Sequence, residues 1–238
     1  MTRNRRLWGA LLVLVMLAFA LRIYRLDFQP LRGDEGFDVM FASRSLPSLV
    51  NELRVTQPYP PLYHVLLHGW FQLAGKSEFA LRFISMSWGV LLVALTYQLG
   101  RELFSAREGL LAALLTAAHP FYLWHAQDGR MYTMLTGLGL ASSLLALQLL
   151  LKRNGTGWRK WTGYAIVTLL SLLTHYFAFL VLAAQNVVAL IEILRRRDAS
   201  LLKRWAASQL VMALLYLPWA IFAWPLLITH SSGWVQPA

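Results

Sequence analysis

Residues 131–151 read MYTMLTGLGLASSLLALQLLL and contain no charged side chain. As a helix, a stretch of about 20 mainly apolar residues is long enough to cross the hydrocarbon core of a bilayer. A helix also satisfies every backbone hydrogen bond within the segment, which lipid cannot do. These residues therefore predict a transmembrane helix and place the chain among integral membrane proteins.

Similar apolar runs lie on both sides of this stretch. In chain order, the predicted transmembrane helices are Leu7–Leu26, Phe79–Leu99, Gly109–Ala126, Met131–Leu151, Trp161–Thr174, Tyr176–Leu194 and Trp205–Ile228. A further run, Leu62–Ala74, is too short to cross a bilayer, so we interpret it as an interfacial or re-entrant helix. The sequence thus predicts an all-α membrane protein of about seven transmembrane helices, in a single polytopic domain over residues 1–238.

The composition agrees with a membrane domain. Hydrophobic residues make up 58% of the chain and charged residues 14%, whereas soluble domains have roughly 45–50% and about 25%. The absence of cysteine excludes disulfides and thiolate metal sites. One alternative concerns the amino terminus, where Ala18-Phe19-Ala20 resembles the end of a cleavable signal peptide. An uncleaved helix is favoured, because the apolar character resumes at Leu21 and Ile23.

The net charge of +11 arises from basic residues that cluster in short connections between the apolar runs. If the amino terminus is cytoplasmic and Leu62–Ala74 does not cross, 14 of the 22 basic residues lie inside, as the positive-inside rule expects. These are Arg3, Arg5, Arg6, Arg101, Arg107, Lys152, Arg153, Arg159, Lys160, Arg195, Arg196, Arg197, Lys203 and Arg204. We expect a multi-pass protein of the inner (plasma) membrane with a lipid bilayer around it and no nucleic-acid partner.

Most carboxylates fall on the opposite side of this topology. The outer set comprises Asp27, Asp34, Glu35, Asp38, Glu52, Glu78 and Asp128. The first outer loop, about residues 27–61, is the longest connection. Within it, Phe37, Met40 and Phe41 recur at helical spacing and predict an amphipathic helix on the membrane surface. Acidic residues contribute little to topology, so a functional outer face is one explanation of their distribution.

Asp34 and Glu35 are the first candidate site residues. An Asp before a helix is a common N-cap, and a Glu in the first turn suits the helix dipole. Two adjacent carboxylates at the membrane surface also suit a general base or a metal ligand pair. Gly33 and Gly36 would let a substrate approach the backbone closely. The local pattern leaves both interpretations open.

Other candidates lie at hinges on the same predicted side. Asp128 and Arg130 either form an ion pair in a polar turn or serve a phosphate, which the planar guanidinium binds through two hydrogen bonds. His175 and Tyr176 form the next outer hinge, where such residues usually anchor a helix at the interface. His64 and His68 share a helix face, a spacing that can bind a metal.

The order of these motifs resembles that of polytopic GT-C glycosyltransferases, in the superfamily of protein O-mannosyltransferases and aminoarabinose transferases (glycosyltransferase family 39-like). The resemblance covers roughly residues 1–220. It rests on Arg32-Gly33-Asp34-Glu35, Tyr59-Pro60-Pro61-Leu62-Tyr63-His64, Gly75-Lys76-Ser77-Glu78, Leu81-Arg82-Phe83-Ile84-Ser85, Gln127-Asp128-Gly129-Arg130-Met131-Tyr132 and His175-Tyr176-Phe177.

The resemblance implies a GT-C fold and an enzyme that moves a sugar from a polyprenyl-phosphate carrier to a lipid, glycan or protein acceptor on the outer face. It implies Asp34 as the general base, with Glu35 assisting. The substrate-binding residues that it implies are Asp128, Arg130, Tyr132, His64, His175 and Tyr176. In the family the hinge is often Gln-Glu-Ala-Arg, so Asp128 and Gly129 are departures.

Two further departures concern the metal and the length. Some relatives carry an acidic metal ligand just before the Pro-Pro pair, where this chain has Thr56-Gln57-Pro58-Tyr59. No cofactor is therefore predicted, and a divalent metal ion is left open. Relatives are commonly longer, so the chain resembles the amino-terminal catalytic half.

Two other functions compete with the transferase. A transporter or flippase needs polar groups or broken helices near the bilayer midplane, and Gln185, Asn186 and His119-Pro120 are sparse candidates. A catalytically incomplete membrane scaffold is the third hypothesis.

Overall fold

A computed structural model describes residues 2–55, 59–151 and 157–230. These residues form eleven α-helices, and none of them lies in a strand. In chain order the helices are α1 (Thr2–Ile23), α2 (Gly33–Ala42), α3 (Leu46–Val55), α4 (Leu62–Ala74), α5 (Glu78–Leu103), α6 (Ala106–Ala118), α7 (Pro120–Ala126), α8 (Tyr132–Leu151), α9 (Trp158–Leu172), α10 (Ala178–Arg196) and α11 (Ala199–His230). The all-α prediction is confirmed for the described part of the chain.

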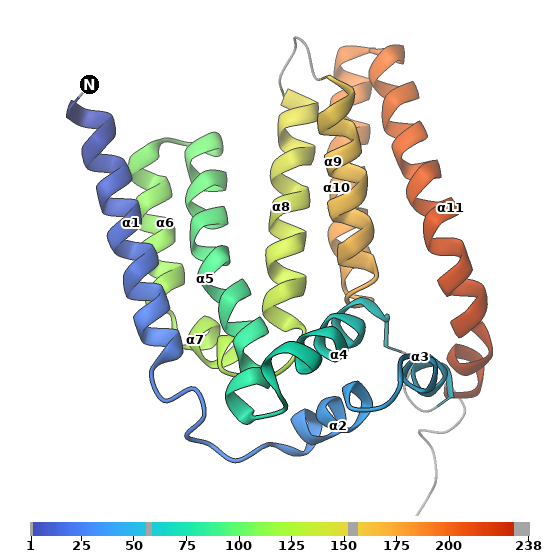
Figure 1. Cartoon of the computed structure of the whole chain (residues 1–238). Helices are drawn as coiled ribbons and strands as arrows, with labels where there is room; N and C mark the ends of the chain where they lie inside the picture. The colour runs from blue at the N-terminus through green and yellow to red at the C-terminus, as the bar shows by residue number, and fades with distance from the viewer. Residues whose placement is uncertain (1, 56–58, 152–156, 231–238) are drawn as a thin grey trace, which may run out of the picture.

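Within the residues that the structure describes, five segments are long and apolar enough to cross a membrane, fewer than the seven expected. They are Arg5–Ile23, Glu78–Leu103, Tyr132–Leu151, Ala178–Arg196 and Ala199–Pro225. The other two predicted spans correspond to α6 and α9, whose 13 and 15 residues extend only about 20 and 22 Å. Both run alongside the longer helices in the same bundle (Figure 1).

The run Gly109–Ala126 is divided by the predicted break at His119-Pro120. Proline has no N–H group, so the Thr116 carbonyl four residues earlier loses its helical donor. Arg22 of α1 replaces that donor, with Nη2 3.1 Å from the Thr116 carbonyl and Nη1 3.1 Å from the Ala117 carbonyl. The Arg22 side chain is fully buried, and it therefore closes the end of α6 at the point where α7 turns away.

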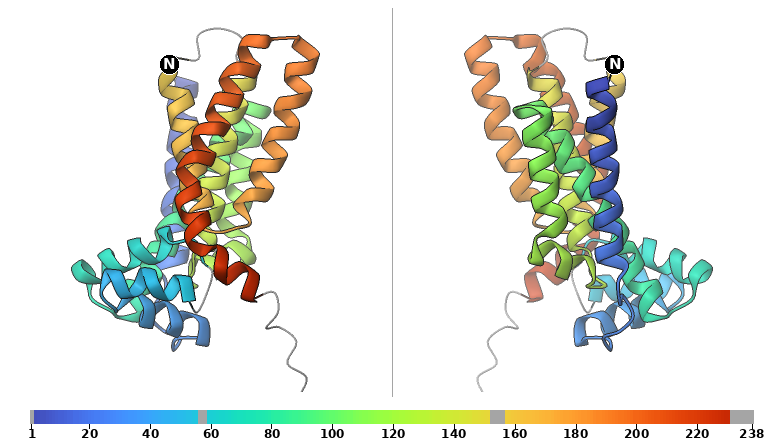
Figure 2. Two further views of the ribbon diagram at one scale, coloured as in Figure 1. Left: turned by 90° about the vertical axis from the view of Figure 1, so that its right-hand side faces the viewer. Right: turned by 90° about the vertical axis from the view of Figure 1, so that its left-hand side faces the viewer.

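Helices α2, α3 and α4 gather at one end of the bundle and project to one side of it (Figure 2). Helix α4 has the predicted bounds and lies across that end. The predicted apolar stripe of α2 is divided, however. Phe37 and Met40 are 48% and 42% exposed, whereas Phe41 is buried against Leu49 of α3 and Trp219 of α11. Only part of the stripe therefore faces the surroundings, because α3 and α11 cover the rest.

The two ends of the bundle differ in content. The amino terminus, the α5–α6 connection, the start of α9 and the α10–α11 connection share one end, and α2, α3, α4 and α7 share the other (Figure 1). Described basic residues of the predicted inner set, such as Arg107 and Lys203, belong to the first end, while Lys152 and Arg153 lie outside the described residues. The carboxylates of the first loop and of the α7–α8 hinge belong to the second end.

Polar residues inside the bundle pair with one another. Gln185 donates to the hydroxyls of Ser142 and Ser143 at 2.8 and 3.0 Å and accepts from the Tyr164 hydroxyl at 3.0 Å. The Asn186 side-chain oxygen accepts from the Trp205 indole at 2.8 Å. Such bonds hold helices together in lipid, and they connect α10 to α8, α9 and α11.

Candidate active site

Glu35 is the most heavily bonded carboxylate at the end of the bundle that carries α2. It lies in the first turn of α2 and is 1% exposed. Arg82 of α5 donates from Nε to Oε1 at 2.9 Å and from Nη2 to Oε2 at 2.8 Å. The backbone N–H groups of Arg32 and Gly129 donate to the same carboxylate at 3.0 and 2.8 Å. Through these four hydrogen bonds, Glu35 connects α2 to α5 and to the α7–α8 hinge.

Arg82 extends this connection to the chain before α2. Its guanidinium also donates to the backbone carbonyls of Leu26, Gln29 and Pro30 at 2.9, 2.8 and 3.2 Å. The side chain is 2% exposed. We name this arrangement the Glu35–Arg82 clamp. Burial alone would raise the pKa of Glu35, but the bonds from Arg82, Arg32 and Gly129 outweigh it and hold that pKa below its usual value.

A second buried carboxylate, Asp38, joins α2 to α4 and the hinge. Its Oδ1 accepts from His64 Nε2 at 3.0 Å, and its Oδ2 accepts from Arg130 Nη1 at 3.1 Å. Asp38 and His64 are both about 1% exposed or less. His64 therefore meets Asp38 and not open space, while His68 bonds the Ala42 carbonyl at 2.9 Å.

Arg130 lies at the centre of the cluster. Its guanidinium also contacts the Asp34 backbone carbonyl at 3.3 Å, and its Nε is buried with no hydrogen-bond partner. The rings of Tyr59 and Tyr132 lie 5.5 and 5.9 Å from its guanidinium carbon. Burial would lower the pKa of Arg130, but the Asp38 carboxylate, Tyr132 and Tyr59 together raise it above its usual value, so the group stays charged. Arg130 is thus a fixed cation with unused hydrogen-bonding capacity.

Asp34 is the exposed member of the cluster. It occupies the second position of α2, directly before the buried Glu35. The clamp places its backbone beside Arg130, as their contact shows. The residue before the helix, Arg32, has a backbone N–H bonded by Glu35, so Glu35 closes the helix end that Asp34 was also expected to cap. Asp34 is the carboxylate that a second molecule can reach.

Asp128 differs from both other carboxylates in having only a distant ion-pair partner. It is 7% exposed, and its Oδ1 lies 3.9 Å from Arg32 Nη1. Burial and the nearby Glu35 charge raise the pKa of Asp128 to about 6, which Arg32 only partly offsets. Such a group can exchange a proton near neutral pH, as perturbed carboxylates in active sites do.

Gly129 is required by the close packing of the hinge. A Cβ atom there would lie 2.5 Å from Leu81 Cγ and 3.1 Å from Glu35 Oε1. The Gly129 carbonyl accepts from the buried Tyr63 hydroxyl at 2.7 Å. The hinge therefore lies too close to Leu81 and Glu35 to leave room for the alanine that relatives often carry at this position.

The remaining expected site residues are Tyr132, His175 and Tyr176. The Tyr132 ring lies close to both Arg130 and His175, 5.9 Å from the Arg130 guanidinium carbon and 6.2 Å from the centroid of the His175 ring. Burial, followed by the Arg130 charge, lowers the pKa of His175. Tyr176 is half-buried and lies beside Trp219 of α11.

Three important residues were not predicted as site residues: Asp38, Tyr63 and Arg82. Arg82 had a detectable signal, because it is an arginine within an otherwise apolar run. Asp38 lies four residues after Asp34 on the same helix, which is one turn. No sequence pattern distinguished Tyr63 as a site residue, because tyrosines are common at membrane interfaces.

The donor set does not identify a metal ion. Within residues 2–55, 59–151 and 157–230, no group of three or more His, Asp or Glu side chains could hold one. The segment Thr56-Gln57-Pro58, where relatives carry an acidic ligand, lies outside the described residues.

Two comparisons with known proteins found a match, one for the family and one for the fold. A family model described as dolichyl-phosphate-mannose-protein mannosyltransferase matches residues 58–222, more than half of the chain. The crystal structure of ArnT from Cupriavidus metallidurans in the apo state superimposes with a TM-score of 0.66 at 18% identity. The match covers 90% of this chain and 42% of ArnT, so the chain spans less than half the length of that protein. A search of curated proteins found no match.

Proposed function

Because the chain belongs to the dolichyl-phosphate-mannose-protein mannosyltransferase family, we propose that it is a membrane glycosyltransferase with Asp34 as its general base. The sugar moves from a polyprenyl-phosphate carrier to a hydroxyl of a lipid, glycan or protein acceptor. One observation carries the proposal: the accessible carboxylate of Asp34 is held one helical turn from Asp38, with its backbone against the buried cation Arg130.

This pairing suits the chemistry of the reaction. An Asp34 carboxylate oxygen takes the proton of the acceptor hydroxyl, and the acceptor oxygen forms a bond to the anomeric carbon. The bond between that carbon and the carrier phosphate breaks, and the phosphate leaves with the electron pair. A fixed cation stabilises the negative charge that develops on the leaving group. Arg130 serves this role through its unpartnered Nε and its fork of donors.

The other residues support these two. His64 orients Asp38, which holds Arg130 in place. Glu35 acts as a positioning residue through the clamp, and this replaces the direct catalytic assistance that the resemblance implies. Asp128, Tyr132 and His175 form the surroundings of the donor head group, and Tyr176 lies at their edge.

The proposed function also requires that the cluster lie on the outer side of the membrane. We propose that α6 and α9 cross with the five longer helices, which gives seven crossings with a cytoplasmic amino terminus. The cluster then lies at the outer face, with α2 at the interface. The carrier's prenyl chain stays in lipid while its phosphate reaches Arg130.

The test uses purified full chain in membranes with a polyprenyl phosphate that carries a radiolabelled sugar. Asp34→Asn should reduce transfer by a factor of about 100 or more, since a general base typically contributes 10²–10⁴. The matched control is Asp27→Asn, because Asp27 is an exposed carboxylate of the same loop and should leave transfer within about twofold. Undiminished transfer by Asp34→Asn would overturn the assignment of the base.

A transporter would give a different result. Uptake of a sugar-carrying lipid or an ion by proteoliposomes, unaffected by Asp34→Asn, would favour transport over transfer. The observed pairing of Gln185 and Asn186 within the bundle explains these polar residues as helix contacts.

A further inference from the structure

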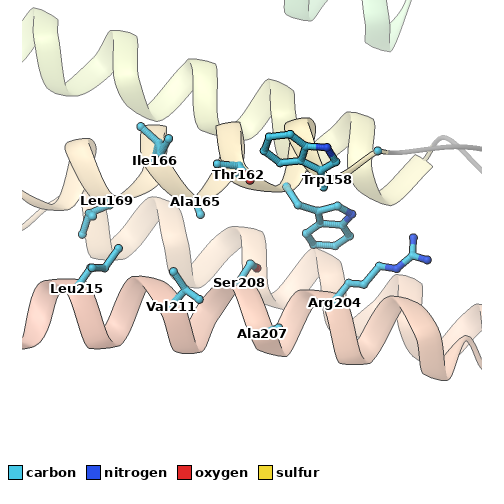
Figure 3. A pocket seen from close by; sticks show the side chains of 12 residues that line it. Trp158, Thr162, Ala165, Ile166, Leu169, Arg204, Ala207, Ser208, Val211 and Leu215 are labelled. Carbon is cyan, nitrogen blue, oxygen red and sulfur yellow. The ribbon is translucent and has the colours of Figure 1, made fainter.

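A long apolar groove lies between α9 and α11, away from the candidate active site. Its volume is about 740 Å³. Figure 3 shows Leu169 of α9 and Leu215 of α11 facing each other across it, and Ile166 and Val211 also line it. The residues that line it are mostly apolar, and Ile166 and Val211 are 52% and 47% exposed. The groove is therefore open at the side of the bundle, where a membrane protein meets lipid.

The length of the groove matches one leaflet. It extends along α9 from Trp158 to Leu169, which is about 17 Å at the rise of an α-helix. Half of a typical hydrocarbon core is about 15 Å. One acyl chain of one leaflet can therefore lie along the groove from end to end.

Only one end of the groove is polar. Arg204 and Trp158 lie together at that end (Figure 3). Further positive charge lies nearby in the chain, because Arg159 and Lys160 follow Trp158 and Lys203 precedes Arg204. Trp161 also lines the groove, and its indole N–H is buried without a hydrogen-bond partner. A ligand with an anionic head and an accepting oxygen would satisfy these groups, because basic pockets between membrane helices attract anionic lipid head groups.

We propose that the α9–α11 groove is a binding site for an anionic glycerophospholipid. One acyl chain lies against Ile166, Leu169 and Val211. The phosphate contacts the Arg204 guanidinium, and an ester or phosphate oxygen accepts from the Trp161 indole. The lipid comes from the leaflet at the end of the bundle that holds the basic connections.

The position of the charge separates this ligand from the sugar donor. Trp158 and Arg204 stand near the beginnings of α9 and α11, whereas His175, beside the candidate site, follows the other end of α9. A prenyl chain whose phosphate is at Arg130 would place no anion near Arg204. The proposal is therefore independent of the proposed transferase activity.

Native mass spectrometry of the full chain, released from detergent, measures this binding directly. Phosphatidylglycerol and phosphatidylcholine of the same acyl composition are added in turn. Phosphatidylglycerol should bind more tightly, and Arg204→Gln should weaken its binding about tenfold or more, because the variant loses a direct hydrogen bond between charged groups. The matched control is Lys203→Gln, the neighbouring exposed cation, which does not line the groove and should change binding less than twofold.

A second variant tests the groove itself. Ala165 lines it, so Ala165→Trp should fill it and reduce the binding of both lipids, with thermal unfolding in detergent reporting whether the fold is kept. The proposal is overturned if Arg204→Gln and Lys203→Gln behave alike, or if phosphatidylcholine binds as well as phosphatidylglycerol. It is also overturned if polyprenyl phosphate displaces the lipid more effectively than phosphatidylglycerol does, because the groove would then serve the donor chain.

Discussion

Replacing Glu35 by glutamine should separate a positioning role from a chemical one. The carboxylate accepts two bonds from Arg82 and two from backbone N–H groups. In Glu35→Gln an amide NH₂ replaces one of the two accepting oxygens and faces donors. Arg82, which is 2% exposed, loses its counter-charge. Removing one partner of a buried ion pair costs about 3–5 kcal/mol.

That free energy predicts a large change in thermal stability. For a chain of this size, 1 kcal/mol shifts the unfolding midpoint by about 2–4 °C, so Glu35→Gln should lower the midpoint by roughly 6–20 °C. Tryptophan fluorescence in detergent micelles can follow unfolding, because the chain has 10 tryptophans. Asp34→Asn is the matched control, one residue earlier on the same helix and exposed, and it should leave the midpoint unchanged within about 2 °C.

A double-mutant cycle gives the refuting result. If the clamp is a structural pair, Glu35→Gln combined with Arg82→Met should cost less than the sum of the single variants, because both act on one interaction. Equal midpoints for Glu35→Gln and Asp34→Asn, together with loss of sugar transfer in Glu35→Gln, would refute the positioning role and assign Glu35 to the chemistry.

Three other predictions concern the hinge and the helix break. Gly129→Ala should destabilise the fold by about 1–3 kcal/mol, since its Cβ would lie 2.5 Å from Leu81 Cγ; adding Leu81→Ala should recover part of the loss in the same unfolding assay. The pKa of Asp128 rises from near 3.8 to about 6 on folding, so its contribution to stability is present at low pH and is lost as the pH rises through about 6. Asp128→Asn should therefore flatten the dependence of the midpoint on pH in that range, and an unchanged slope would contradict the assignment. Arg22→Met removes the side-chain donors to the Thr116 and Ala117 carbonyls and should cost about 2–3 kcal/mol; faster hydrogen exchange in α7 than in α10 would locate the loss at the break, and uniform exchange would speak against it.

Local sequence patterns were sufficient for much of the helical framework. Helix α4 has the predicted bounds. Pro120 divides the apolar run Gly109–Ala126 into two helices, at the break that the sequence indicated. Apolar content and length alone identify the five long segments. These features depend on residues that are neighbours in the chain, so a reader of the sequence can find them. The length of α6 was overestimated, because the apolar run continues past the break at Pro120 into α7. Helix α9 has about the predicted length but begins three residues earlier, at Trp158.

The site was only partly visible from the sequence. The sequence by itself identified Asp34 and Glu35 as adjacent carboxylates of the first outer loop, and Asp128 and Arg130 as polar residues at a hinge between two apolar runs. Only the tertiary structure decided that Asp34 is accessible while Glu35 is buried, since the two are neighbouring carboxylates of the same short motif. The partners that bury Glu35 are Arg82 and Gly129, 47 and 94 residues away. Hydropathy and helical period are local properties, whereas the pairing of buried charges depends on which helices pack together, and that arrangement determines which carboxylate remains accessible.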